Sequence, residues 1–134
     1  MIRRKKKTQQ QREGAAVIEF AVCLPVILLI VLGTIEAGNM LFLKQTLVQA
    51  AYEGAKVAIV TGDTERTEAS INAVAAGRNI QNLEVEFVPT NLADAVPGQT
   101  ISVIVSAPGD TNSIIPFGPF RNRIVRNSTS MVRE

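Results

Sequence analysis

The acidic side chains after residue 61 are the first candidates for chemistry, because carboxylates act as general acids and bases in many enzymes. Glu84 and Glu86 lie two residues apart in a predicted strand and point to the same face, whereas Asp94 and Asp110 lie in predicted loops. None of these carboxylates has a Ser or Cys partner at a recognisable spacing, and the sequence contains no His. We therefore expect a solvated face, no catalytic residue and a protein that is not an enzyme.

The sequence also lacks the usual patterns of metal and cofactor sites. The stretch Asp110-Thr111-Asn112-Ser113 has oxygen ligands as a calcium loop does, but the Gly and the distal Glu of an EF-hand are missing, so we interpret it as a turn. Cys23 is the only cysteine, which excludes a disulfide framework, a zinc site and a Cys/His catalytic pair within one chain. We expect no cofactor and no metal.

Glu19 is a carboxylate inside an apolar run whose only other ionisable side chain is Cys23. A carboxylate costs about 2.5–3.5 kcal/mol at the centre of a membrane helix, so residues of this kind usually have a partner. Two interpretations stay open. Glu19 either pairs with another group inside the membrane or lies close enough to the membrane surface to reach water.

The apolar run covers residues 14–35, GAAVIEFAVCLPVILLIVLGTI, and its length suits the roughly 20 residues of a membrane-spanning helix. A basic segment precedes it, with Arg or Lys at positions 3–7 and 12. By the positive-inside rule the N-terminus stays in the cytoplasm and the chain after Ile35 crosses the membrane. Ile35 and Glu36 stand where a cleaved secretory signal has small residues, so we expect the anchor to be retained.

The length and charge of the chain exclude several classes of protein. Its 134 residues, 46% hydrophobic and 4% aromatic, leave room for one membrane segment and one small domain. The net charge is +2, but residues 1–14 hold six of the 14 basic groups and one of the 12 acidic groups, so the remainder has a net charge of −3. The basic character belongs to the leader, and we expect no binding to nucleic acid.

The helix is predicted to continue beyond the membrane to Val60, because residues 36–60 contain no Pro and Gly62 is a suitable stop. Apolar or small residues recur with helical spacing along one face of this part: Met40, Leu43, Leu47, Ala50, Gly54 and Val57. The series Ala50, Gly54 and Ala58 allows another backbone to come close. This face receives either the chain's own C-terminal domain or the helix of another subunit.

Residues 61–134 are predicted to form a small domain. Asp63-Thr64 offers a helix N-cap and Gly77 a helix end. Alternating patterns predict strands over residues 83–87 and 100–107 and a last, edge strand over 122–133, with a turn at Pro97-Gly98. The loop 108–120 carries four apolar anchors: Ile114, Ile115, Phe117 and Phe120.

The expected fold class is therefore α+β, with a long N-terminal helix, one short helix and about three antiparallel strands. We divide the chain into a leader (1–14), the long helix (15–60, with its membrane half at about 15–36) and an outer α+β domain (61–134).

The segment Gly14-Ala15-Ala16-Val17-Ile18-Glu19-Phe20 resembles the processing site of type IV prepilins, in which a Gly precedes a Glu and an aromatic residue between a basic leader and an apolar helix. Together with Pro25 in the helix, it resembles the TadE-like pseudopilins of tight-adherence (Flp) pilus systems. The resemblance extends to residues 33–38, 50–58 and 127–134, whereas residues 61–120 contribute little. The chain departs from the broader group in lacking a cysteine pair in its outer domain.

The resemblance implies that a membrane prepilin peptidase cuts between Gly14 and Ala15 on the cytoplasmic side. Glu19 would then lie one helical turn from the new α-amino group of Ala15, and an amine from a neighbouring subunit would be a suitable partner for its carboxylate. Pro25 has no N–H and would open the helix near Ala21, which would help the anchor leave the bilayer and pack into a filament.

We therefore hypothesise a minor pseudopilin that takes part in the assembly of a Flp (type IVb) pilus, with Glu19, Phe20 and Pro25 acting in assembly. Its expected partners are the prepilin peptidase, other pilins or pseudopilins, the pilus assembly machinery and the bacterial inner membrane, with the outer domain on the periplasmic side. The alternative is an uncleaved single-span envelope protein whose outer domain binds a periplasmic partner.

Overall fold

The structure is a computed structural model that describes the backbone of residues 3–115, 118 and 122–133, and the side chains of these ranges from residue 14 onward. The chain divides into two compact units, Met1–Ile35 and Glu36–Glu134. The predicted apolar anchors Phe117 and Phe120 lie outside the described residues.

Helix α1 (Arg3–Thr61) contains 59 residues and supplies both the first unit and the start of the second. It begins at Arg3, twelve residues before the start predicted for the long helix at Ala15. The reason is that Arg, Lys, Gln and Glu are good helix formers and residues 3–13 contain neither Pro nor Gly. The helix ends as predicted before Gly62, whose φ of 62° suits glycine and whose N–H donates to the Ala58 carbonyl at 2.9 Å.

In the first unit, every residue from 14 to 35 is exposed, although most of them are apolar. This is the one described helix that is long and apolar enough to cross a membrane. A helix that is hydrophobic on all sides is stable when apolar surroundings cover all of its faces. The unit is therefore compatible with a membrane anchor.

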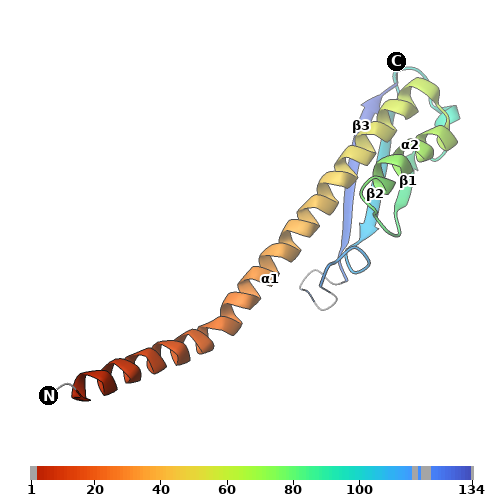
Figure 1. Ribbon diagram of the computed structural model, residues 1–134. Helices are drawn as coiled ribbons and strands as arrows, with labels where there is room; N and C mark the ends of the chain where they lie inside the picture. The colour runs from red at the N-terminus through yellow and green to blue at the C-terminus, as the bar shows by residue number, and fades with distance from the viewer. Residues whose placement is uncertain (1–2, 116–117, 119–121, 134) are drawn as a thin grey trace. The chain divides into compact units, whose positions relative to one another are not determined.

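The second unit has the predicted α+β composition. After α1 come helix α2 (Thr64–Ala76), strand β1 (Glu84–Val88), the short 3₁₀ helix η1 (Leu92–Asp94), strand β2 (Thr100–Pro108) and strand β3 (Ile124–Val132). The three strands form an antiparallel sheet in the order β1-β2-β3, and Figure 1 shows them beside the outer part of α1. The fold prediction is confirmed, including the position of the last strand at an edge, whereas η1 was not predicted.

Helix α2 has the predicted N-cap. The Asp63 side chain accepts hydrogen bonds from the N–H groups of Glu65 and Arg66 at 3.0 and 3.3 Å, which satisfies two of the free donors of the first turn. Gly77 follows the helix, but its backbone is right-handed (φ −59°), and the chain leaves the helical path through Asn79, which has a φ of 52°.

The core lies between the outer part of α1, the inner face of the sheet and α2. On β2 the inner residues Ile101, Val103 and Val105 are fully buried and alternate with the outer residues Ser102, Ile104 and Ser106, as expected for a strand with an alternating pattern. On α1 the predicted stripe is buried except at its end, where Ala58 is buried and Val57 is half-buried. The buried residue at the end of the stripe is thus Ala58 and not Val57. The reason is that the helix has 3.6 residues per turn, so the buried face does not recur at a constant spacing.

Candidate functional site

The segment from Gly14 to Phe20 lies on α1 and all of its residues are exposed. A Cβ atom at Gly14 would meet nothing within 4 Å, so this position is sterically open. Gly is also the weakest helix former in the segment, by about 1 kcal/mol relative to Ala, so the helix is locally least stable there. Ala15 and Glu19 are four residues apart and therefore lie above one another on the same helical face.

Pro25 lies inside α1. Because Pro has no N–H, the carbonyl of Ala21 lacks its usual helical donor. The surroundings of this carbonyl are apolar, so it is a weak point of the helix inside the proposed membrane segment. Phe20 and Cys23 are exposed side chains in the same stretch.

The small residues Ala50, Gly54 and Ala58 are all buried in the core of the outer unit. A Cβ atom added at Gly54 would lie 2.6 Å from Cδ1 of Ile71 in α2 and 3.5 Å from Cγ1 of Val103 in β2. The glycine therefore permits a close approach of α1 to α2 and the sheet. Of the two interpretations of this face, the structure shows packing against the chain's own domain.

Sequence reasoning missed the role of Glu36, which is fully buried. Its Oε2 accepts hydrogen bonds from the backbone N–H groups of Ile114 and Ile115, each at 3.2 Å, and the Ser113 hydroxyl donates to Oε1. A buried carboxylate is stable when such donors replace its hydration. Gly118 also lies close, since a Cβ atom there would be 3.4 Å from Cγ of Glu36.

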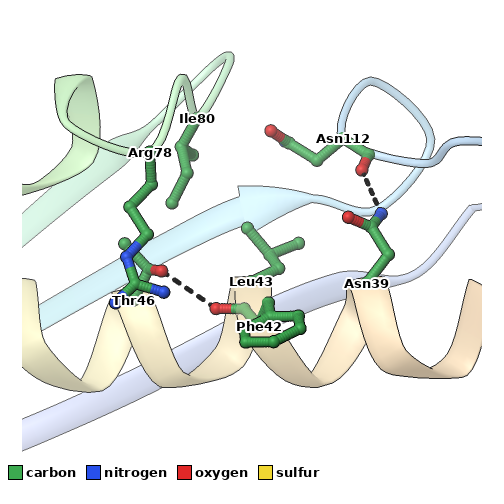
Figure 2. A pocket seen from close by; sticks show the side chains of 7 residues that line it. All are labelled: Asn39, Phe42, Leu43, Thr46, Arg78, Ile80 and Asn112. Atoms are coloured by element: carbon green, nitrogen blue, oxygen red, sulfur yellow. Dashed lines mark hydrogen bonds between the residues drawn. The ribbon is translucent and has the colours of Figure 1, made fainter.

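Asn112 is a second polar connection between distant segments. Its backbone carbonyl accepts a hydrogen bond from Nδ2 of Asn39 in α1 at 2.7 Å (Figure 2). Its side chain accepts from the N–H of Gln81 at 2.9 Å and donates to the carbonyls of Gln81 and Pro108 at 3.0 and 2.8 Å. The stretch that begins at Asp110 forms a turn, as predicted. Asn112 joins this turn to α1, to the residues before β1 and to the end of β2.

A small hollow lies beside these contacts, between α1 and the connection from α2 to β1. Its volume is about 80 Å³, far below the several hundred Å³ of a typical small-molecule site. Figure 2 shows Phe42, Leu43 and Thr46 on α1 facing Arg78 and Ile80 on the connection. The hydroxyl of Thr46 donates to the Phe42 carbonyl at 2.9 Å, and the hollow holds no pair of nucleophile and base.

Of the acidic side chains singled out in the sequence, Glu84 is exposed, and Glu86, Asp94 and Asp110 take part in surface contacts. Glu86 in β1 forms an ion pair with Arg126 in β3 at 2.7 Å, with both side chains more than half exposed. Asp94 accepts a hydrogen bond from the side chain of Asn91, and Asp110 accepts one from the N–H of Thr111. Among the described residues, no group of three or more His, Cys, Asp or Glu side chains could hold a metal ion.

Replacing Glu36 by Ala tests the importance of the buried carboxylate. We expect Glu36→Ala to lower the free energy of unfolding of the outer domain by about 1.5–3 kcal/mol, because the donors at residues 113–115 lose a charged acceptor. The measurement is urea unfolding of the full chain in detergent, followed by circular dichroism.

The matched control is Glu53→Ala, which removes a half-exposed carboxylate from the same helix. Glu53 pairs only with Lys56, at 3.3 Å, among the described residues, and a surface pair of this kind contributes about 0.3–0.5 kcal/mol. Equal unfolding midpoints for the two variants would contradict the structural role of Glu36.

Comparison with known families finds a match in the N-terminal part of the chain. The family model described as TadE-like protein matches residues 14–56, from Gly14 through Glu19 and Pro25 to Lys56. No curated protein and no solved structure matches the chain. The family suggests involvement in Tad pilus systems, in agreement with the apolar helix that is compatible with a membrane anchor. The resemblance seen in the sequence is thus confirmed over residues 14–56, about a third of the chain, which are similar to the TadE-like family.

Proposed function

We propose that the protein is a minor pseudopilin, a structural component in the assembly of a Tad (Flp, type IVb) pilus. The observation that carries this proposal is the segment Gly14 to Phe20. It lies exposed between a basic leader and an apolar helix, and the family match begins at its first residue.

The proposed first step is cleavage between Gly14 and Ala15 by a prepilin peptidase at the cytoplasmic side of the inner membrane. Cleavage removes a leader with a net charge of +5, which otherwise holds the N-terminus at the cytoplasmic surface. It also frees an α-amino group on Ala15, whose positive charge is far smaller than that of the leader. The mature helix can then move out of the bilayer with fewer charges to transfer.

The proposed role of Glu19 follows from its position in this mature helix. The side chain is exposed in the first unit, where protein does not cover it. In apolar surroundings an unpaired carboxylate is costly, and an amine on a neighbouring subunit offsets that cost. Glu19 would thereby select correctly placed neighbours among pilins or pseudopilins.

The outer unit is proposed to act as a structural domain on the periplasmic side and not as an enzyme. Support for a structural role comes from the packing of this unit, in which α1, α2 and the sheet share one core and Glu36 binds the loop that returns from the sheet. The proposed partners are therefore the peptidase, other pilins and the pilus assembly machinery.

Replacing Gly14 by Leu tests the processing step. We expect the wild-type protein from native membranes to begin at Ala15 and Gly14→Leu to keep residues 1–14, because a bulky side chain blocks the cleavage position. Intact mass and N-terminal sequencing distinguish the two forms. Gly33→Leu is the control, because Gly33 is also an exposed glycine of α1 where an added Cβ atom would meet nothing within 4 Å, and we expect normal cleavage.

A wild-type chain that keeps Met1 in normally piliated cells would overturn the proposal. That result would favour the uncleaved envelope protein, whose function would then depend on binding by the outer domain.

Replacing Glu19 by Gln tests the assembly step separately. Because Gln keeps the shape but removes the charge, we expect normal cleavage but a loss of pili of at least about tenfold, as breaking a buried ion pair costs about 3–5 kcal/mol. The readouts are the N-terminus of the mature protein and the number of pili per cell in electron micrographs. Glu53→Gln, at a half-exposed carboxylate outside the apolar run, is the control with normal piliation. Normal piliation in the Glu19→Gln strain would refute the role of Glu19.

A further inference from the structure

We propose that the loop of residues 112–115, here called the clamped loop, is a second membrane contact of this protein, with Ile114 inserted into the lipid interface. This inference goes beyond the pilus function and does not depend on cleavage at Gly14. It rests on where the chain attaches the loop to α1.

The level of the clamped loop along α1 is fixed by Glu36. This residue directly follows Ile35, the last residue of the apolar run, and one helical step is a rise of about 1.5 Å. Because the two residues are covalently linked, Glu36 lies at the end of the membrane segment whatever the orientation of the outer domain. Any segment that is hydrogen-bonded to Glu36 must therefore lie close to the end of the membrane segment.

Four hydrogen bonds attach the clamped loop to α1 at Glu36 and Asn39. The Ser113 hydroxyl and the N–H groups of Ile114 and Ile115 donate to the Glu36 carboxylate, and the Asn112 carbonyl accepts from Asn39, less than one turn further along α1. These hydrogen bonds therefore restrain the loop against α1.

The exposed surface at this level has the chemistry of a lipid-facing surface. Glu36 is the only ionisable residue between Ile35 and Lys44, and its side chain is fully buried. Ile114 is 61% exposed, and Leu41 and Phe42, five and six residues after Glu36 on α1, are exposed as well. These exposed apolar side chains lie within about two helical turns of Ile35 along α1, and contact with another apolar phase would remove them from water. Lipid is that phase, because the apolar helix already places this surface at the bilayer.

The chain contains no Trp, so a single introduced Trp reports on its own surroundings. We would place it at position 114 (Ile114→Trp) in the full-length protein, reconstituted in vesicles of phosphatidylethanolamine and phosphatidylglycerol. Vesicles with dibrominated acyl chains quench a Trp that reaches the acyl boundary. Circular dichroism identical to that of the wild type shows that each variant is folded.

Val96→Trp is the matched control. Val96 is also 61% exposed, but it lies near the other end of the outer domain. The neighbouring Ala95 carbonyl accepts from Arg133, whose guanidinium lies against Gly62 at the end of α1. Gly62 is 26 residues from Glu36, or roughly 39 Å along the helix.

We expect brominated lipid to lower the emission of the Ile114→Trp protein about twofold and to leave the Val96→Trp protein unchanged, since interfacial side chains reach roughly 5–10 Å into the bilayer boundary. In a Glu36→Ala background, the quenching at position 114 should fall towards the control value while the helical signal of the anchor stays.

Three results would overturn the proposal. Equal quenching at positions 114 and 96 would show that level along α1 does not decide lipid contact. A blue-shifted but unquenched Trp at position 114 would show burial against protein, such as a second copy. Undiminished quenching in the Glu36→Ala background would show that the clamp does not hold the loop at the membrane.

Discussion

The structure depends on a change of surroundings along one helix. Ile35 is 48% exposed and Glu36 is fully buried, so α1 passes within one residue from a segment without protein cover to a segment that forms one side of a core. The first segment needs apolar side chains on every face, and the second needs them on one stripe only. Glu36 stands at the border, where its carboxylate is satisfied by the loop that returns from the sheet.

The outer domain follows from how this helix is held in place. Its middle is packed through small residues, above all Gly54, which lets Ile71 of α2 come close. Its two ends are fixed by polar contacts. At the end next to the apolar run, Glu36 and Asn39 bind residues 112–115. At the other end, the Arg133 guanidinium, which lies against Gly62, donates to the carbonyls of Leu92 and Ala95. A domain without a disulfide thus keeps its register along α1 by packing in the middle and hydrogen bonds at both ends.

The helices and strands with a regular spacing of apolar residues could be predicted from the sequence. The outer part of α1 and strand β2 were predicted because apolar residues recur at helical or alternating spacing, and α2 because Asp63 is a good N-cap. The leader has no apolar period, so only its helix propensity could have predicted the early start at Arg3. Glu36 was missed because its partners lie 77 to 79 residues away in the chain. A lone carboxylate directly after the apolar run was the only local signal. Gly14 and Glu19 were recognised from resemblance to a family, since an exposed helix gives them no distinguishing geometry.

The most direct test of this account is the accessibility of single cysteines to a membrane-impermeant maleimide applied from outside spheroplasts. The native Cys23 reports on the apolar run, and Gln45→Cys in a Cys23→Ser background reports on an exposed position of α1 nine residues after Glu36. The account predicts labelling at position 45 without permeabilisation and no labelling at Cys23 in the wild type. Labelling of Cys23 in intact spheroplasts, or labelling at position 45 only after permeabilisation, would contradict the membrane anchor or its orientation.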